Sequence, residues 1–367
     1  MQPTTCITKG KDALRHLLHP LLAVAVIGLV SVAQPSLAVA AKKNTVPTLA
    51  ESATAKEFIA EMHEQHGFDA AELGRQFAAV HSNAVVLRAI QPAAVPEQQR
   101  SWLRYRARFL NERRLSYGLK FWEQHGATLA RAQALYGVPQ EIIVAIIGVE
   151  TEYGRNTGNF RVLEALATLA FDYPPRAPFF RSELEQFLLL ARENGIEPLD
   201  YKGSYAGAIG IPQFMPSSQR RYAVDFDGDG HIDLRGSATD AIGSVASFLS
   251  MHGWQPGSAI ALPAGVDGDT RELVAAGIKP WLSLREIRDK GVQPLIADDA
   301  ALADLPVALI DLVTPDQPTE YWLGFDNFYV ITRYNRSSFY AMSVFLLAES
   351  LRETRATTTV AGQHPTP

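Results

Sequence analysis

Residues 138–154 read VPQEIIVAIIGVETEYG, and we interpret the fold of the rest of the chain around this stretch. Pro139 suits the first position of a helix, an acidic residue follows in the first turn, and the sequence is then apolar up to Val149. A helix that is apolar on all sides lies inside the protein, so we predict a buried helix that turns away at Gly154. Its last turn would carry Glu150 from the core into a cleft.

Glu150 is the candidate general acid at this helix end. A carboxyl group held against apolar walls keeps its proton near neutral pH, because desolvation penalises the charged form. Glu152 lies about 200° further round a helix, so the two glutamates would point to opposite sides and form no carboxylate pair. The pattern alone does not choose between them, and it fits equally well two solvated side chains at a frayed helix end.

The composition is that of a globular protein, with 367 residues, 47% of them hydrophobic, and a net charge of −5. The length allows roughly two or three packed units, and the negative charge argues against nucleic acid as a partner. In residues 1–40, basic residues precede an apolar run at 21–33, and Ala38-Val39-Ala40 fits a signal-peptidase site. We predict a cleavable export signal, with a retained membrane anchor as the alternative. The only cysteine, Cys6, precedes the apolar run, so the mature chain would hold no disulfide.

Residues 202–218 read KGSYAGAIGIPQFMPSS. Glycines and prolines among small and aromatic residues favour a loop whose backbone approaches a ligand closely. The loop lacks the Gly-Lys-Ser/Thr order that binds phosphate, so a phosphate site is not predicted.

Residues 225–233 read DFDGDGHID and match the first nine positions of an EF-hand calcium loop. Position 12 is Gly236 instead of the usual glutamate, and Asp240 could replace it. A plain Asp/Gly turn is the alternative. The predicted ligands of a structural Ca²⁺ are Asp225, Asp227, Asp229, His231 through its backbone carbonyl, and Asp240.

An arginine-rich stretch with interleaved Trp102 and Tyr105 precedes the buried helix. Such a mixture could bind an acidic polymer, but a solvated helical face explains most such runs. Its arginines are Arg100, Arg104, Arg106, Arg108, Arg113 and Arg114. At the other end of the chain, β-branched runs at 307–313 and 320–325 predict a small β-containing domain.

Seven motifs, in order and at suitable spacing, resemble the B type of soluble and membrane-bound lytic murein transglycosylases, bacterial enzymes that cleave peptidoglycan. Together they span roughly residues 55–352, and the ordered set is far more specific than any one motif. They are IGVETEYG (147–154), LATLAFDYP (166–174), GAIGIPQFMPSS (207–218), DFDGDGHID (225–233), DAIGSVA (240–246), HGW (252–254) and RYN (333–335).

The resemblance implies an α+β fold that is predominantly α, with a lysozyme-like core, a flanking helical domain and a small β-containing domain. With the patterns above, it suggests a division of the whole chain. The predicted parts are a signal peptide (1–40), a flexible lead-in (41–54), a helical domain (55–138, joined by 338–355), the lysozyme-like catalytic core with its EF-hand-like loop (139–254, joined by 322–337), the β-containing domain (255–321) and a disordered tail (356–367).

The resemblance also selects Glu150 over Glu152 as the catalytic acid. The candidate substrate-binding residues are Ser204, Gln213, Tyr334, Asn335 and, where the family has an aromatic residue, Phe248, together with Tyr153. We expect Ser204 and Asn335 to hydrogen-bond Glu150 or the acetamido group, and Gln213 to orient the sugar. We expect the two tyrosines to stack on sugar rings, with core packing as the alternative for each.

The sequence departs from the family pattern in places. Pro212 stands where members often have a second glycine, Phe248 lacks a hydroxyl, and the loop after Asp233 is slightly longer. Lipid-tethered members carry a cysteine directly after the signal, and this chain does not. We therefore predict a soluble periplasmic monomer acting on murein glycan strands, with inner-membrane anchoring by an uncleaved segment as the alternative. Cell-wall synthesis or division proteins as partners are not identified by the sequence.

Ordinary glycosidases use two carboxylates, and this sequence offers one convincing candidate. Asp172 is the nearest alternative, but its Tyr-Pro surroundings suit a helix end. One acid suffices if the substrate supplies its own nucleophile. The resemblance implies that Glu150 cleaves the bond between N-acetylmuramic acid and N-acetylglucosamine and closes a 1,6-anhydro ring, without water or an organic cofactor. The alternatives are a hydrolytic muramidase with a second carboxylate and a non-catalytic wall-binding protein.

Overall fold

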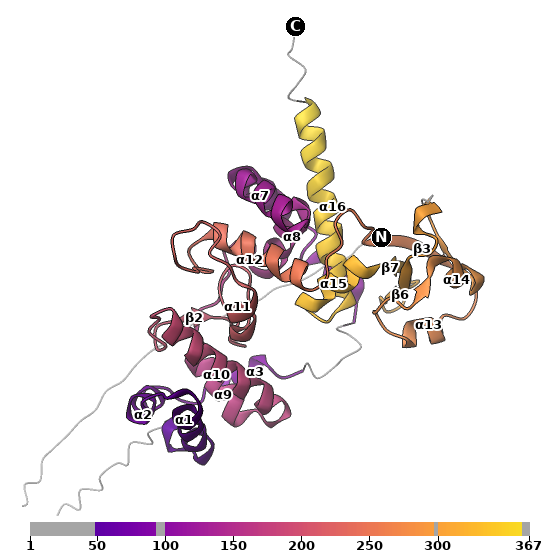
Figure 1. Ribbon diagram of the computed structural model, residues 1–367. Helices are drawn as coiled ribbons and strands as arrows, with labels where there is room; N and C mark the ends of the chain where they lie inside the picture. Colours follow the sequence, from indigo (N-terminus) through magenta and orange to yellow (C-terminus); the bar gives the residue numbers. More distant parts are fainter. Residues whose placement is uncertain (1–47, 93–99, 297–299, 362–367) are drawn as a thin grey trace, which may run out of the picture. The chain divides into compact units, whose positions relative to one another are not determined.

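The computed structural model describes residues 48–92, 100–296 and 300–361 (Figure 1). The predicted signal peptide and residues 41–47 of the predicted lead-in lie outside the described residues. The helices are η1 (Leu49–Glu51), α1 (Ala53–His66), α2 (Ala70–Ala78), α3 (Ala84–Ala89), α5 (Trp102–Ala107), α6 (Glu112–Gln124), α7 (Gly126–Tyr136), α8 (Gln140–Thr151), α9 (Val162–Asp172), η2 (Pro174–Arg176), α10 (Ala177–Glu193), α11 (Pro216–Tyr222), α12 (Ala238–Met251), α13 (Arg271–Ala275), α14 (Leu284–Asp289), η3 (Ala300–Leu302), α15 (Asp326–Tyr334) and α16 (Ser338–Ala361).

The strands form one short pair and one small sheet, so the predicted α+β class, mainly α, is confirmed. In the pair, β1 (Phe160–Arg161) runs antiparallel to β2 (Lys202–Gly203). The sheet has the order β4-β6-β7-β3-β5 with antiparallel neighbours, and the runs predicted at 307–313 and 320–325 form its strands β6 and β7. Its strands are β3 (Ala261–Val266), β4 (Leu282–Ser283), β5 (Val292–Pro294), β6 (Pro306–Leu312) and β7 (Glu320–Gly324).

Strand β6 is apolar throughout most of its length because both faces of the sheet are covered. Ala308, Ile310 and Leu312 belong to the hydrophobic core built around α8, whereas Val307 and Leu309 belong to the core of the β-containing domain. Alternate residues of a strand point to opposite faces, so one strand contributes to two cores. The sheet therefore packs against the helical core that contains α8, the helix that carries the candidate acid.

Helix α8 is the centre of the largest hydrophobic core. Its neighbours are α6, α7, α12 and α16 (Figure 1). A second core joins α1, α2 and α3 to α9 and α10, which pack against each other. The helices of the predicted domain 55–138 therefore divide between two cores, because α1 to α3 bury their apolar faces against α9 and α10 instead of against α5 to α7.

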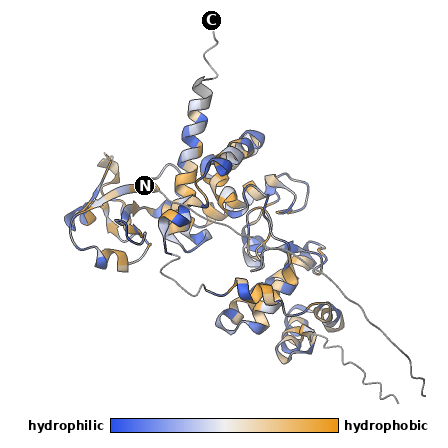
Figure 2. Cartoon of the chain, turned by 180° about the vertical axis from the view of Figure 1, so that it is seen from behind, coloured by the Kyte–Doolittle hydropathy of each residue, from blue (hydrophilic) through white to orange (hydrophobic). Residues whose placement is uncertain are grey.

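Two predicted flexible segments are partly ordered. At the start, Leu49 is buried and its N–H donates to the Val80 carbonyl at 3.1 Å, so the lead-in is structured from residue 48. At the end, α16 continues to Ala361 instead of stopping at residue 355. Figure 2 shows this helix apolar where it packs against the core and more hydrophilic in the middle of its length. Residues 362–367 of the predicted tail lie outside the described residues.

Within the described part of the chain, no single helix is long and apolar enough to cross a membrane. Helices α7 and α8 meet the length and composition criteria only as a pair, and the pair is bent by 113° between Tyr136 and Gln140.

Candidate active site

Helix α8 places the candidate acid at its C-terminal end. The helix is buried from Ile142 to Val149, as the apolar run predicted, and the next residue, Glu150, is half-buried. The predicted start is one residue too early, and the helix ends three residues before the predicted turn at Gly154. Pro139 is the N-cap, because its ψ of 143° is extended, and the helix ends at Thr151 before the chain reaches Gly154.

The carboxyl group of Glu150 accepts a hydrogen bond from α16. The Tyr340 hydroxyl donates to Oε1 of Glu150 at 2.6 Å. Burial raises the pKa of Glu150 from its ordinary 4.5 to about 7, and the hydrogen bond from Tyr340 acts in the opposite direction by stabilising the carboxylate. At neutral pH the group is therefore close to half-protonated, which suits a residue that both donates and accepts a proton.

Three tyrosines share the surroundings of Glu150. Burial raises the pKa of Tyr105, Tyr334 and Tyr340 above the ordinary 10, and the nearby Glu150 carboxylate raises each of them further. The rings of Tyr334 and Tyr340 lie nearly parallel, with planes 14° apart and centroids 6.4 Å apart. The phenols are neutral at physiological pH, so they lower the polarity around the acid without adding a countercharge.

Glu152 has a different set of partners. It is buried, with 6% of its surface exposed, and Nη2 of Arg113 on α6 lies 2.7 Å from its Oε1. Asn156 donates to its other carboxylate oxygen at 3.1 Å. The alternative of two solvated glutamates at a frayed helix end is therefore wrong, because one is half-buried beside tyrosines and the other is ion-paired.

Phe248 was predicted to line the substrate site, but it is buried. Its ring centroid lies 4.8 Å from that of Tyr334 and 5.6 Å from that of Phe214. Helix α12 is buried from Asp240 to Leu249, so its aromatic residue enters the core instead of facing solvent. Phe248 packs against the ring of Tyr334, and its own ring is too buried to contact a sugar.

Tyr334 connects the end of α15 to the glycine-rich loop 202–218. Its hydroxyl donates to the carbonyl of Pro212 at 2.6 Å, and its ring packs on Phe214 and Phe248. The residue is half-buried: one part of its surface packs in the core, and the rest is open to solvent.

Ser204 and Gln213 hold the shape of that loop. The Ser204 hydroxyl accepts from the backbone N–H groups of Ala206 and Ala208, at 3.2 and 2.9 Å. Of its two expected partners, Glu150 and the acetamido group of the sugar, Glu150 is not among those that it contacts in the described part of the chain. The amide of Gln213 donates to the Gly210 carbonyl at 2.9 Å. Gln213 has φ +53°, a left-handed conformation that a side chain rarely adopts, and its own hydrogen bond helps to maintain it.

Asn335 and Tyr153 have different surroundings. Asn335 is exposed just after α15, and among the described residues its side chain makes no hydrogen bond with Glu150. The ring of Tyr153 packs against Phe121 of α6 with centroids 5.6 Å apart, and its hydroxyl oxygen is buried. Core packing, the alternative for this tyrosine, therefore describes it better than sugar stacking.

The EF-hand-like loop brings three of its predicted ligands together. Carboxylate oxygens of Asp225, Asp227 and Asp229 lie within 4.8 Å of one another, and all three residues are exposed. Hard oxygen donors at this spacing fit Ca²⁺. His231 is exposed in the same loop, where its backbone carbonyl is the predicted ligand.

Asp240 was predicted to bind calcium, but it holds the backbone of the loop instead. It is 1% exposed, and its carboxylate accepts backbone N–H groups of Phe226 and Asp233 at 2.8 Å and of Asp227 at 3.3 Å. The side chain therefore ties the two ends of the loop to the start of α12. It does not join the three-carboxylate group, because its oxygens are already occupied by donors of the loop backbone.

Two residues beside Glu150, Tyr105 and Tyr340, were not among the sequence-predicted site residues. Tyr105 stood in the arginine-rich stretch, noticed only for its mixture of charge and aromaticity, and Tyr340 lay in the predicted last helix. Neither position carries a local pattern that points to a site. Only the packing of α5 and α16 near the end of α8 brings them to the carboxyl group.

A lysozyme-like fold with a half-buried carboxyl group, whose pKa burial raises to about 7, fits an enzyme of the lytic transglycosylase class. Residues 50–349 match the family model of the transglycosylase SLT domain, and the chain belongs to this family of lytic murein transglycosylases.

Individual relatives agree. The membrane-bound lytic murein transglycosylase B of Escherichia coli K12 is 42% identical over 311 residues, which cover 82% of this chain and 83% of that protein. The soluble lytic transglycosylase SltB1 of Pseudomonas aeruginosa is 49% identical, with a TM-score of 0.75 over 82% of this chain and 99% of its own. The Escherichia coli lytic transglycosylase Slt35, solved in complex with calcium, is 40% identical with a TM-score of 0.73 over 86% and 98%.

Proposed function

We propose that this enzyme cleaves the β-1,4 bond between N-acetylmuramic acid and N-acetylglucosamine in peptidoglycan, with Glu150 as its single acid and base. The observation that carries the proposal is the half-buried carboxyl group with a pKa of about 7 and a tyrosine hydroxyl on one oxygen. Membership of the transglycosylase SLT family supports the substrate class.

In the first step, protonated Glu150 donates its proton to the glycosidic oxygen. The bond between that oxygen and C1 of the muramyl residue breaks, and the N-acetylglucosamine leaves with a new hydroxyl. Glu150 is now a carboxylate, and the hydrogen bond from Tyr340 to Oε1 stabilises its charge. The other carboxylate oxygen is the one assigned to proton transfer.

In the second step, the Glu150 carboxylate accepts the proton of the muramyl C6 hydroxyl. The C6 oxygen bonds to C1 of the same sugar, which closes the 1,6-anhydro ring and returns Glu150 to its protonated form. No water is consumed. General acid and base action contributes roughly 10²- to 10⁴-fold, and orientation of the bound sugar supplies much of the rest.

A hydrolytic muramidase would need a second carboxylate to activate water or to form a covalent intermediate. Glu152 is held by Arg113 and Asn156, and Asp172 is exposed at the end of α9. Among the described residues, burial and Tyr340 set the pKa of Glu150, and no carboxylate contributes. These contacts favour the intramolecular reaction over hydrolysis.

For substrate binding we propose the surface formed by Tyr334, Asn335 and the loop 202–218. The exposed amide of Asn335 and the half-buried ring of Tyr334 supply a donor and an apolar face. Ser204 and Gln213 shape the loop from within, through their hydrogen bonds to its backbone. Phe248 and Tyr153 act beneath this surface and are not proposed to touch the sugar.

The test is a digest of purified sacculi read by mass spectrometry, with a Glu150→Gln variant beside the wild type. We expect the wild type to release muropeptides one water lighter than reducing-end products. The variant should keep its circular dichroism spectrum, remain folded at neutral pH and release essentially nothing. Reducing ends in the wild-type digest, or substantial release by the variant, would overturn the assignment.

We further propose a structural Ca²⁺ held by Asp225, Asp227, Asp229 and the His231 carbonyl. The three clustered carboxylates support it, as does the calcium complex of the related Slt35. The ion would neutralise their mutual repulsion and fix the loop between α11 and α12. It has no place in the two catalytic steps.

The proposed location is the periplasm, reached by cleavage after Ala40. The substrate class and the basic-then-apolar N-terminal sequence support it. Mass spectrometry of the protein recovered from a periplasmic extract should give a chain that begins at Ala41. A full-length chain in the membrane fraction would favour the uncleaved anchor.

A further inference from the structure

The backbone directly after the candidate acid is strained. Glu152, Tyr153 and Gly154 have φ values of +51°, +63° and +81°, so three consecutive residues are left-handed. Side chains disfavour this conformation, and it persists only where surrounding contacts impose it. The turn follows Glu150 with only Thr151 between, so whatever holds the turn also orients the last turn of α8.

Two neighbouring arginines at the start of α6 hold this turn. Arg114 donates through Nη1 to the carbonyl of Gly148, which also accepts the N–H of Glu152 at 3.1 Å. Arg113 reaches Glu152, with Nη2 at 2.7 Å from Oε1 and 2.9 Å from Oε2. One arginine thus binds the helix two residues before Glu150, and the other binds it two residues after.

The exposure of the two partners shows why the ion pair matters here. The side chain of Arg113 is 69% exposed, whereas that of Glu152 is 7% exposed. An ordinary surface pair contributes little, but removing the ion-pair partner of a buried carboxylate leaves a charge that must find water. Because Glu152 is itself part of the left-handed turn, its movement toward water would disturb that turn.

The opposite side of the turn is closed by Tyr153. A Cβ atom added at Gly118 or Gly148 would lie 2.4 or 2.6 Å from the Tyr153 hydroxyl oxygen, so the phenol fills the space between these two glycines. Glycine in both helices lets α6 and α8 approach closely enough for the arginines to reach the helix end. The close packing of α6 against α8 therefore brings the two arginines within reach of the turn.

We propose that Arg113 and Arg114 are positioning residues, which aim the Glu150 carboxyl group by clamping the left-handed turn that ends α8. The inference rests on the proposed role of Glu150. Tyr340 restrains one oxygen of that carboxyl group, and the backbone of α8 sets the direction of the rest. Neither arginine contacts the reacting atoms.

The tests are Arg113→Met, Arg114→Met, Arg114→Lys and Glu152→Gln, assayed at a temperature at which each variant is folded. We expect kcat to fall about tenfold or more in the two methionine variants, with KM changed less than about twofold, because a misaligned acid slows chemistry and not binding. Arg114→Lys should recover part of kcat. The double variant Arg113→Met/Glu152→Gln should cost no more than the worse single variant.

The pH profile separates positioning from general loss of stability. Burial and Tyr340, not the guanidinium groups, set the pKa of Glu150, and the other titratable groups that interact with it are Tyr105 and Tyr334. A displaced Glu150 would become more solvated, so the high-pH limb of kcat/KM should move to lower pH in the methionine variants. An unmoved limb with unchanged kcat would overturn the inference.

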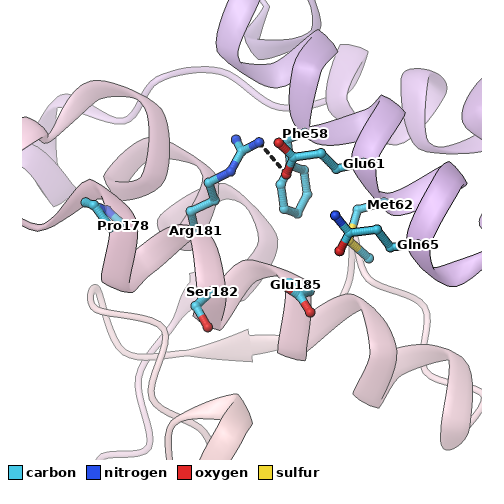
Figure 3. A pocket seen from close by; sticks show the side chains of 8 residues that line it. All are labelled: Phe58, Glu61, Met62, Gln65, Pro178, Arg181, Ser182 and Glu185. Carbon is cyan, nitrogen blue, oxygen red and sulfur yellow. Dashed lines mark ion pairs between the residues drawn. The ribbon is translucent and has the colours of Figure 1, made fainter.

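Arg181 supplies a matched control. It also joins two helices through a glutamate, with Nη2 2.6 Å from Oε2 of Glu61, at a cavity of about 210 Å³ between α1 and α10 (Figure 3). Arg181 lies over the ring of Phe58, which belongs to the second core. Arg181→Met should leave kcat and the pH profile unchanged even if it lowers the melting temperature. Equal losses of kcat in Arg181→Met and Arg113→Met would overturn the inference.

The Glu150→Gln variant distinguishes the two proposals. If that variant is inactive and the arginine variants behave as the wild type, the clamp is wrong and the catalytic assignment stands. If Glu150→Gln retains turnover, the catalytic assignment itself fails. A loss of kcat in the arginine variants would then have to act through a residue other than Glu150.

Discussion

The hydroxyl of Tyr340 donates a hydrogen bond to Oε1 of Glu150 at 2.6 Å, across a separation of 190 residues in the chain. Two opposing influences meet in this contact. Burial favours the protonated acid, whereas the hydrogen bond favours the carboxylate. The balance places the pKa of Glu150 at about 7, where both forms are available.

Tyr340→Phe should raise the pKa of Glu150, because the hydrogen bond that stabilises its carboxylate is lost. A hydrogen bond to a charged group contributes roughly 1.5–3 kcal/mol, which corresponds to about one to two pH units. The high-pH limb of kcat/KM should move upward accordingly, while kcat falls because an acid of higher pKa gives up its proton less readily in the first step. A pH–rate profile on a soluble glycan substrate checks this. A limb that stays in place would show that Tyr340 does not act on the acid.

Wild-type kcat/KM should decline above pH about 7, by about tenfold per unit for a single ionisation, because the first step needs protonated Glu150. An activity maximum well above this value would contradict the assignment of Glu150 as the acid. The control is the melting temperature over the same pH range, which separates loss of the proton from loss of the fold.

Stability should depend on pH through the same group. The folded pKa of about 7 exceeds the ordinary 4.5, so the folded state binds the proton more tightly than the unfolded chain does. This contribution is complete below pH about 4.5 and is lost as the pH rises through about 7. Glu150→Gln cannot ionise, so its stability relative to the wild type should increase from pH 5 to pH 9, by at most about 3 kcal/mol. Denaturant titrations at both pH values measure it, and equal differences would contradict the raised pKa.

Calcium should raise the melting temperature of the wild type, and a chelator should reverse the change, because the ion binds the folded loop only. Asp227→Ala should abolish this response, since Asp227 is one of the three clustered carboxylates. Asp172→Ala removes an exposed carboxylate elsewhere and should keep it. Calorimetric titration that detects no binding, together with an unchanged melting temperature, would dismiss the metal site.

Asp240→Ala should destabilise the fold by about 2–4 kcal/mol, because backbone N–H groups of Phe226, Asp227 and Asp233 lose their buried acceptor. Urea unfolding in the presence of chelator isolates this loss from any effect of calcium. A change within about 0.5 kcal/mol would mean that water replaces the carboxylate at little cost.

Gly118→Ala should cost about 1–3 kcal/mol, since the new methyl group would meet the Tyr153 hydroxyl oxygen at 2.4 Å. Tyr153→Phe removes that oxygen, which is buried and has no hydrogen-bond partner among the described residues, and should recover part of the loss in the double variant. Gly74→Ala, where a Cβ meets nothing within 4 Å, is the control. Thermal melts of the four proteins decide the outcome.

The sequence by itself determined the elements whose signals are local. Periodicity and spacing over short stretches of sequence predicted the apolar run of α8, the strands β6 and β7, and the cluster of Asp225, Asp227 and Asp229. Local sequence also narrowed the acid to two glutamates, and the resemblance to a family chose Glu150. Helix ends were less well determined, because Pro139 and the left-handed Glu152 depend on contacts beyond the helix.

Only the tertiary structure decided what each side chain faces. Tyr340 and Tyr105 reach Glu150 from segments far along the chain. Arg113 forms an ion pair with Glu152, and the packing of α12 buries Phe248. The division of the N-terminal helices between two cores likewise depends on α9 and α10. The physical reason is the same in each case. Burial, and with it the pKa and the hydrogen-bond partners of a group, is set by whichever remote segment covers it, and a local pattern carries no record of that segment.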